Sequence, residues 1–149
     1  MFTTEEQNVI DEAIKIIESK FKSNGVQFNS SKAVKDFFRL EIASSPYEIF
    51  GVLFLNTKHE FIAFEEMFKG TINSAAVYPR EVVRAAINHN AAAIIFTHNH
   101  PSGDTVPSDS DIEITERLKD ALNLIEVRVL DHIVVSETST YSFAEHGLL

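Results

Sequence analysis

Two stretches of the sequence are apolar on both faces of an extended chain, and they constrain the fold more than any other feature. Residues 47–55 are rich in β-branched and aromatic side chains, and residues 91–97 form a second apolar run. Strands of this kind are buried, with other elements packed on the sheet that contains them. The sequence therefore predicts a sheet whose central strands are covered by helices.

Apolar residues recur at three- and four-residue steps elsewhere in the chain, which indicates helices. The predicted helices cover residues 4–22, 31–43, 79–88 and 108–122, and the further predicted strands cover residues 60–68, 71–77, 125–136 and 141–143. This order of elements predicts a mixed α/β sheet with helices packed on it. We expect residues 1–45 to form a short helical extension and residues 46–149 to form the catalytic domain.

A polar segment at the end of the strand at 91–97 carries residues suited to metal binding. His98 and His100 lie two residues apart, and residues i and i+2 of an extended chain point the same way, so both imidazoles can reach one ion. Asp111 begins the next predicted helix, and a loop rich in Pro and Gly can return it to the pair. Two His and one carboxylate form a three-ligand site, in which a catalytic zinc keeps a water at its fourth position.

Hydrolysis at such a site also needs a general base and a group that stabilises the oxyanion. Ser108 precedes Asp111 by three residues and shares its helix face. Glu48 is a lone charge near the start of the apolar strand, and burial raises the pKa of a carboxyl, as a general base near neutrality requires. The rival carboxylates are Glu41, Glu65 and Glu81.

Other interpretations of these residues stay open at this point. Glu48 could be a surface charge at a strand edge, and Ser108 with Asp111 resembles a helix capping box. Two His and a carboxylate also bind iron in oxygenases, although the neighbouring Ser108 and Glu48 favour hydrolysis. For Asp131 and His132 we favour a buried, hydrogen-bonded pair over a role in orienting a ligand histidine.

The spacing resembles the metal motif of the JAMM (MPN-plus) metalloprotease family, which is His-x-His, seven residues, Ser, two residues and Asp, with an upstream Glu. Four blocks resemble the RadC-like branch of that family: Tyr-Pro-Arg-Glu at 78–81, Asn-Ala-Ala-Ala at 90–93, His-Asn-His-Pro-Ser-Gly-Asp at 98–104 and Leu-Asp-His-Ile-Val-Val at 130–135. The resemblance covers about residues 31–149. It implies a mixed β-sheet flanked by helices, similar to the cytidine-deaminase-like architecture.

The resemblance also implies a role for each residue of the motif. His98, His100 and Asp111 would ligate Zn2+, Glu48 would act as general base on the zinc-bound water, and Ser108 would stabilise the oxyanion. The implied activity is that of a zinc metallohydrolase, a metallopeptidase or isopeptidase. The resemblance leaves two alternatives: a DNA-repair-associated protein acting on or near nucleic acid, and a non-catalytic MPN binding module.

Charge and composition bear on the partners. The chain has 13 Lys and Arg against 22 Asp and Glu, a net charge of −9, which argues against strong binding to nucleic acid or an anionic membrane. No apolar run reaches the roughly 20 residues of a membrane span, and the first residues lack the pattern of a signal peptide. We therefore expect a cytoplasmic protein, and the resemblance to the JAMM family implies a peptide or isopeptide substrate. The absence of Cys excludes a thiolate zinc site and a Cys nucleophile.

Overall fold

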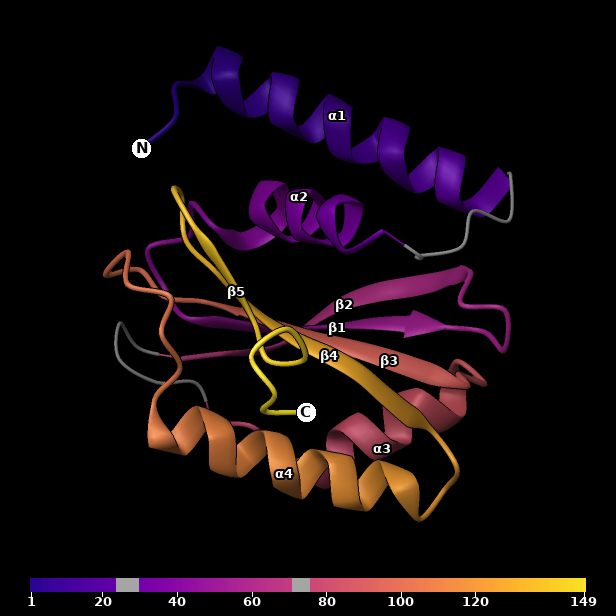
Figure 1. Cartoon of the computed structure of the whole chain (residues 1–149). Helices are drawn as coiled ribbons and strands as arrows, with labels where there is room; N and C mark the ends of the chain where they lie inside the picture. The colour runs from indigo at the N-terminus through magenta and orange to yellow at the C-terminus, as the bar shows by residue number, and fades with distance from the viewer. Residues whose placement is uncertain (24–29, 71–75) are drawn as a thin grey trace.

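The fold is a mixed sheet between two layers of helices (Figure 1). The computed structural model describes residues 1–23, 30–70 and 76–149, without the side chains of residues 20–23. Among these residues, five strands form one sheet in the order β2-β1-β3-β4-β5. Helices α1 and α2 lie on one side of the sheet, and α3 and α4 lie on the other. The predicted mixed α/β sheet flanked by helices is confirmed.

The bounds of the elements agree with most of the sequence-based expectations. The helices are α1 (Thr4–Ser23), α2 (Ser31–Ile42), α3 (Pro79–Asn88) and α4 (Asp109–Asn123). The strands are β1 (Ile49–Leu55), β2 (Phe61–Lys69), β3 (Ala93–Asn99), β4 (Arg128–Val135) and β5 (Thr140–Ser142). Of the further strand predicted at 71–77, residues 71–75 lie outside the described residues, and residues 76 and 77 are not in a strand.

Two strand ends differ from the expectation for physical reasons. Strand β3 continues through His98 and Asn99, because His98 pairs with Phe50 of β1 and with Val134 of β4. Strand β4 begins three residues later than predicted, because Glu126 adopts a left-handed backbone conformation with φ of 60° in the turn that follows α4. The longer β3 matters for the candidate site, because it places His98 near the end of a central strand and His100 directly after its end.

The central strands are paired in both senses. Strand β1 is antiparallel to β2 and to β3, whereas β3 and β4 are parallel and are joined by α4. Every residue of β1 and of β3 is buried, as their apolar sequences predict. The start of β1 therefore lies beside the end of β3, at the edge of the sheet where α4 begins.

Each face of the sheet has its own apolar core. On one face α2 contributes Phe37 and Phe38, whose rings lie 5.4 and 5.7 Å from that of Phe64 on β2. On the other face α3 and α4 pack on the sheet through Val82, Ala86, Leu118 and Leu122. The division into an extension at 1–45 and a domain at 46–149 stays a prediction, but α2 packs directly into the core of the sheet.

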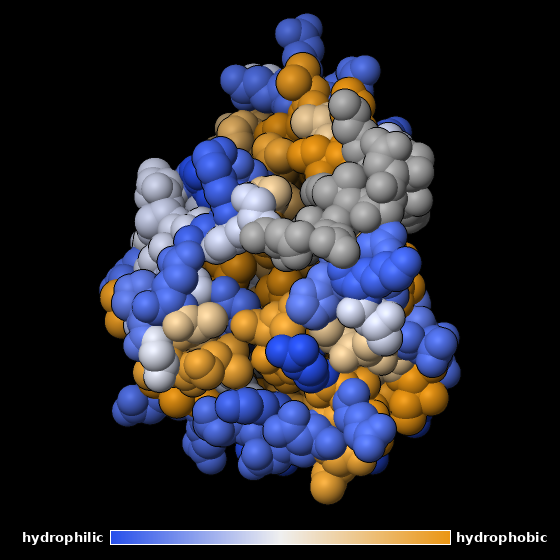
Figure 2. All heavy atoms as spheres, turned by 45° about the vertical axis from the view of Figure 1, so that its right-hand side comes forward, coloured by the Kyte–Doolittle hydropathy of each residue, from blue (hydrophilic) through white to orange (hydrophobic). Residues whose placement is uncertain are grey.

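Helix α1 lies outermost and is less buried than the other helices. Val9 is 68% exposed and Ile16 is 50% exposed. Figure 2 shows apolar side chains at the surface near the top of the molecule, where α1 lies, and mostly hydrophilic side chains at the bottom, below α3 and α4. No helix in the described part of the chain is long and apolar enough to cross a membrane.

Candidate metal centre

The strand register brings four potential ligands together at one edge of the sheet. Phe50 of β1 lies opposite His98 of β3, and the antiparallel direction brings Glu48, just before β1, towards His100. Helix α4 begins at the same edge and supplies Asp111. One ligand atom from each of Glu48, His98, His100 and Asp111 lies within 4.8 Å of all the others.

The distances within this cluster suit a single metal ion. The two Nε2 atoms of His98 and His100 lie 2.9 Å apart, and Asp111 Oδ2 lies 3.3 Å from the first and 3.2 Å from the second. Ligand atoms around one tetrahedral zinc are separated by about 3.3 Å, since each lies about 2.0 Å from the ion. Imidazole nitrogens with a carboxylate oxygen also form a donor set that zinc accepts. The cluster therefore fits a metal site of the JAMM type.

The loop after β3 orients His100. A turn at Gly103, which has φ of 93°, returns the chain so that the carbonyl oxygen of Asp104 lies 2.7 Å from His100 Nδ1. A carbonyl can only accept, so His100 donates from Nδ1 and keeps Nε2 for the cluster. A hydrogen bond with Asp111 raises the pKa of His100 in the metal-free site. A metal ion that binds here would displace the proton that His100 Nε2 shares with Asp111.

Ser108 and Asp111 form the capping box of α4, so the structural interpretation of this pair is confirmed. Ser108 Oγ accepts the amide proton of Asp111 at 3.1 Å, and Asp111 Oδ2 accepts the amide proton of Ser108 at 2.9 Å. Burial alone would raise the pKa of Asp111, but its hydrogen bonds with His100 and Ser108 and the close approach of His98 hold that pKa well below its usual range. The same carboxylate thus caps the helix and faces both histidines as an anion.

Glu48 lies in the cluster and is only 8% exposed. Burial raises the pKa of its carboxyl; the nearby Asp111 raises it further, and His98 and His100 act in the opposite sense. The alternative of a surface charge at a strand edge is therefore wrong. A buried carboxyl with a raised pKa can exchange protons near neutrality, as a general base must.

The three rival carboxylates lie outside this cluster. Glu65 lies 3.3 Å from His89, and Glu81 lies 3.2 Å from Arg84. Glu41 is on α2, where burial together with the nearby Glu18, Glu66 and Asp11 raises its pKa to about 7. None of the three belongs to the group of potential ligands found among the described residues.

Asn99 holds the backbone on both sides of Glu48, and the sequence analysis did not identify this residue. Its Oδ1 accepts the amide proton of Ile49 at 2.7 Å, and its Nδ2 donates to the carbonyl oxygens of Tyr47 at 2.9 Å and Ser45 at 3.3 Å. The sequence did contain a feature that could have identified Asn99: it lies between His98 and His100 and therefore points to the opposite face of β3.

The adjacent residues Asp131 and His132 do different things. Asp131 lies within β4, not at a strand end, and has a structural role: it accepts hydrogen bonds from the amides of His132 and Ala144 and from the hydroxyl of Ser142. His132 instead lies with its Nε2 2.7 Å from His98 Nδ1. The favoured interpretation therefore fits Asp131, whereas the alternative, a partner of a ligand histidine, fits His132.

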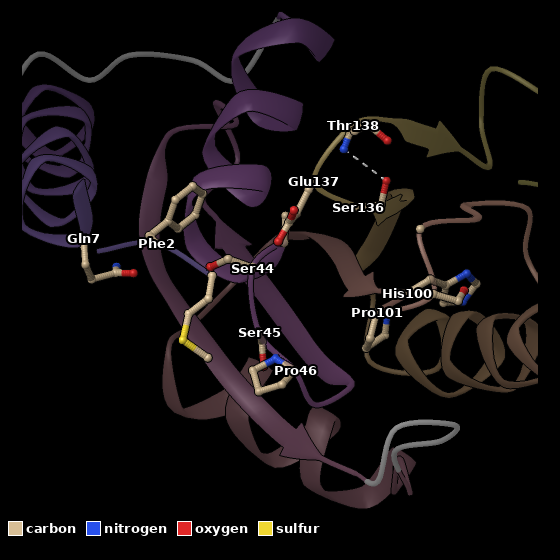
Figure 3. A pocket seen from close by; sticks show the side chains of 14 residues that line it. Phe2, Gln7, Ser44, Ser45, Pro46, His100, Pro101, Ser136, Glu137 and Thr138 are labelled. Atoms are coloured by element: carbon tan, nitrogen blue, oxygen red, sulfur yellow. Dashed lines mark hydrogen bonds between the residues drawn. The ribbon is translucent and has the colours of Figure 1, made fainter. Parts of the chain in front are cut away.

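A pocket of about 530 Å3 opens beside the cluster (Figure 3). His100 and Pro101 lie on one side of it, and Phe2 lies on the opposite side. The rest of its lining comes from residues 102 and 103, the segment at 43–46, the turn at 136–138 and further residues near the start of the chain. Of the four clustered residues, His100 is the one that lines this pocket. No Lys or Arg side chain is among the described residues that line it.

Comparison with known proteins gives a consistent result. The family described as RadC-like JAB domain matches residues 28–148. A UPF0758 protein of Vibrio cholerae is 50% identical over 144 residues, which cover 97% of this chain and 90% of that protein. The UPF0758 protein YeeS of Escherichia coli is 46% identical over 147 residues, 99% of each chain. A UPF0758 protein of Methylibium petroleiphilum is 58% identical over 122 residues, but these make up only 55% of that longer protein.

Proposed function

Because this chain belongs to the RadC-like JAB domain family, we propose that its cluster of Glu48, His98, His100 and Asp111 is the centre of a zinc-dependent hydrolase that cleaves a peptide or isopeptide bond. The observation that carries the proposal is the meeting of four ligand atoms within 4.8 Å beside an open pocket. The donor atoms suit zinc, and His98, His100 and Asp111 would hold it.

A zinc ion held here would polarise the scissile carbonyl and lower the pKa of a coordinated water. Glu48 then accepts the proton that the attacking water releases as its oxygen bonds to the carbonyl carbon. The same carboxyl returns that proton to the leaving nitrogen as the C–N bond breaks, which yields a carboxylic acid and an amine. The raised pKa of Glu48 suits both steps, since its carboxyl both accepts and releases a proton.

Ser108 is the proposed partner of the developing oxyanion. Its Oγ already accepts the amide proton of Asp111, so its own hydroxyl proton remains to be donated. A donor fixed by a helix cap is preorganised, and it stabilises charge in the transition state without reorganising. The capping role and the catalytic role are compatible, because they use different parts of the same hydroxyl.

The choice among substrates rests on the pocket and on the overall charge. A pocket lined by hydroxyl groups, apolar side chains and the carboxylate of Glu137, with no Lys or Arg side chain among the described residues, suits a polypeptide better than a phosphate backbone. The net charge of −9 points the same way. We therefore do not extend the proposal to nucleic acid, and a DNA-repair association and the cytoplasmic location stay predictions. The presence of all four potential ligands favours an enzyme over a non-catalytic module.

The metal content of the purified protein tests the proposal directly. Elemental mass spectrometry should find about one zinc per chain, and His100→Ala and Asp111→Ala should lose it while circular dichroism shows a retained fold. His146→Ala replaces an exposed histidine outside the cluster and should keep the metal. Glu48→Gln should keep zinc and lose hydrolysis across a panel of peptides and isopeptides. A native protein that takes up no metal even from added zinc would refute the proposed function.

A further inference from the structure

His132 lies directly against the proposed metal centre but has no role in the hydrolysis described above. The side chain is fully buried, with 0% exposure. Its ring stacks on Phe143 at 4.5 Å between centroids and makes edge contacts with Phe50 at 5.5 Å and Phe96 at 5.8 Å. A polar ring in such apolar surroundings is stable only if both of its nitrogens find partners.

Both nitrogens of His132 belong to one chain of short hydrogen bonds. His98 Nδ1 lies 2.7 Å from His132 Nε2, and His132 Nδ1 lies 2.6 Å from the hydroxyl oxygen of Thr115 on α4. The Thr115 hydroxyl in turn donates to the backbone carbonyl oxygen of Asp111 at 2.6 Å. The chain thus runs from one proposed ligand, His98, to the backbone of another, Asp111.

The carbonyl of Asp111, at the end of this series of hydrogen bonds, is the starting point for assigning the donor in each of them. A carbonyl only accepts, so the single proton of the Thr115 hydroxyl points at Asp111, and the lone pairs of Thr115 Oγ1 face His132. His132 must therefore donate from Nδ1. Apolar surroundings disfavour an imidazolium, so Nε2 of His132 carries a lone pair and accepts a proton from Nδ1 of His98. His98 is left with its own lone pair on Nε2, the atom that faces the cluster.

We propose that His132 and Thr115 are positioning residues that fix the tautomer and the ring orientation of His98 for metal binding. This inference rests on the proposed metal centre. The Nδ1 proton of His100 is fixed by one bond to the carbonyl of Asp104, whereas that of His98 is fixed through two side chains. Partners of this kind typically change metal affinity by 10- to 100-fold when they are removed.

The tautomers can be measured without metal or substrate. In the metal-free full-length protein, long-range 1H–15N correlation spectra should show both His98 and His132 protonated at Nδ1 and bare at Nε2. A proton found on Nε2 of His98, in place of the one on Nδ1, would overturn the inference. This measurement does not depend on whether the protein hydrolyses anything.

Zinc affinity provides the second test, by competition with a chromophoric chelator. Thr115→Val removes the acceptor for His132 and should weaken zinc binding 10- to 100-fold, whereas Thr115→Ser keeps the hydroxyl and should stay within about threefold of the native affinity. Thr97→Val is the matched control, since it removes a buried hydroxyl that donates to the carbonyl of Ile133 at 2.8 Å, next to His98 but outside the chain. It should also stay within about threefold.

The outcomes separate this inference from the proposed function. If the native protein binds one zinc and Thr115→Val binds it as tightly, the inference fails and the metal centre stands. If Thr97→Val weakens binding as much as Thr115→Val, the effect is general destabilisation and the inference also fails. If the native protein binds no zinc, the proposed function and this inference fail together.

Discussion

Replacing Asn99 by Ala should separate metal binding from catalysis, because the Asn99 side chain hydrogen-bonds the backbone on both sides of Glu48 and not the side chains of the proposed ligands. The amide side chain is fully buried and makes three hydrogen bonds to the backbone at Ser45, Tyr47 and Ile49. Truncation to Ala removes all three bonds. The bonds that orient the two proposed histidine ligands, from His100 to the carbonyl of Asp104 and from His98 to His132, are left intact.

The size of the effect follows from these contacts. Each net hydrogen bond contributes about 1 kcal/mol, so we expect the free energy of unfolding to fall by about 3 kcal/mol. For a chain of this size that corresponds to a melting temperature lower by roughly 6–12 °C. A general base displaced by about 1 Å can lose about a hundredfold in rate, so we expect kcat to fall by about 10- to 100-fold. Zinc affinity should stay within about threefold.

The assay combines thermal unfolding, zinc titration and hydrolysis of whichever substrate the screen identifies. Asn56→Ala is the matched control, since its side chain accepts amide protons from Lys58 and Glu60 at the far end of β1. This control should lower stability by about 1–2 kcal/mol and leave kcat unchanged. The reasoning is refuted if Asn99→Ala hydrolyses the substrate at the native rate, or if it loses zinc along with activity while remaining folded.

Three other perturbations test the structure at separate points. Glu41 has a pKa near 7 in the folded state, above its ordinary value of 4.5, so the folded state binds more protons and stability should fall as the pH rises from about 5 to 8. After allowance for partial solvent exposure we expect the free energy of unfolding to fall by about 1–2 kcal/mol over this pH range, measured by urea unfolding. Glu41→Gln should abolish this fall. If the free energy of unfolding of the variant depends on pH as in the native protein, other groups cause the fall. Gly51→Ala would place a Cβ 2.6 Å from a ring carbon of Phe64 and should lower the free energy of unfolding by about 1–3 kcal/mol, again measured with urea. An unchanged free energy of unfolding would show that the ring moves aside freely. Zinc at a hundred times its dissociation constant should stabilise the native protein by about 2.7 kcal/mol. Removal of the zinc with a chelator should therefore lower the melting temperature by roughly 5–11 °C. The same shift in His98→Ala would contradict the proposed ligand set.

The proposed ligands could be identified from the sequence because three of them are close in the chain. The two-residue step from His98 to His100 and the capping pattern at Ser108 and Asp111 are local features, and local geometry brought them together as expected. Glu48 is different, since only the pairing of β1 with β3 places it in the cluster. The apolar segment around it made Glu48 the best candidate among the carboxylates, but the resemblance to a known family was needed to prefer a general base over a surface charge at a strand edge.

An orienting role for His132 was an alternative from the sequence, but its contacts with His98 and Thr115 could not be predicted, because they depend on register and on packing between distant elements. His132 reaches His98 only because Phe96 and not a neighbouring residue of β3 lies opposite His132 in the parallel pair with β4. Thr115 reaches His132 because α4 packs on the sheet at that point. No periodicity or local motif encodes either contact, and a shift of one residue in the register would turn His132 to the other face.

The position of Glu48 just before β1, far along the chain from the other proposed ligands, has a consequence for the order of folding. His100 and Asp111 are eleven residues apart, whereas the bond between Ile49 and Asn99 joins residues fifty apart. Closing the longer loop carries the larger entropic penalty, and such contacts generally form late. A partly folded chain would therefore bring together the proposed metal ligands His98, His100 and Asp111 first and would add Glu48 only when β1 docks. The proposed hydrolysis would then depend on the finished fold, because a folding intermediate would lack the proposed general base.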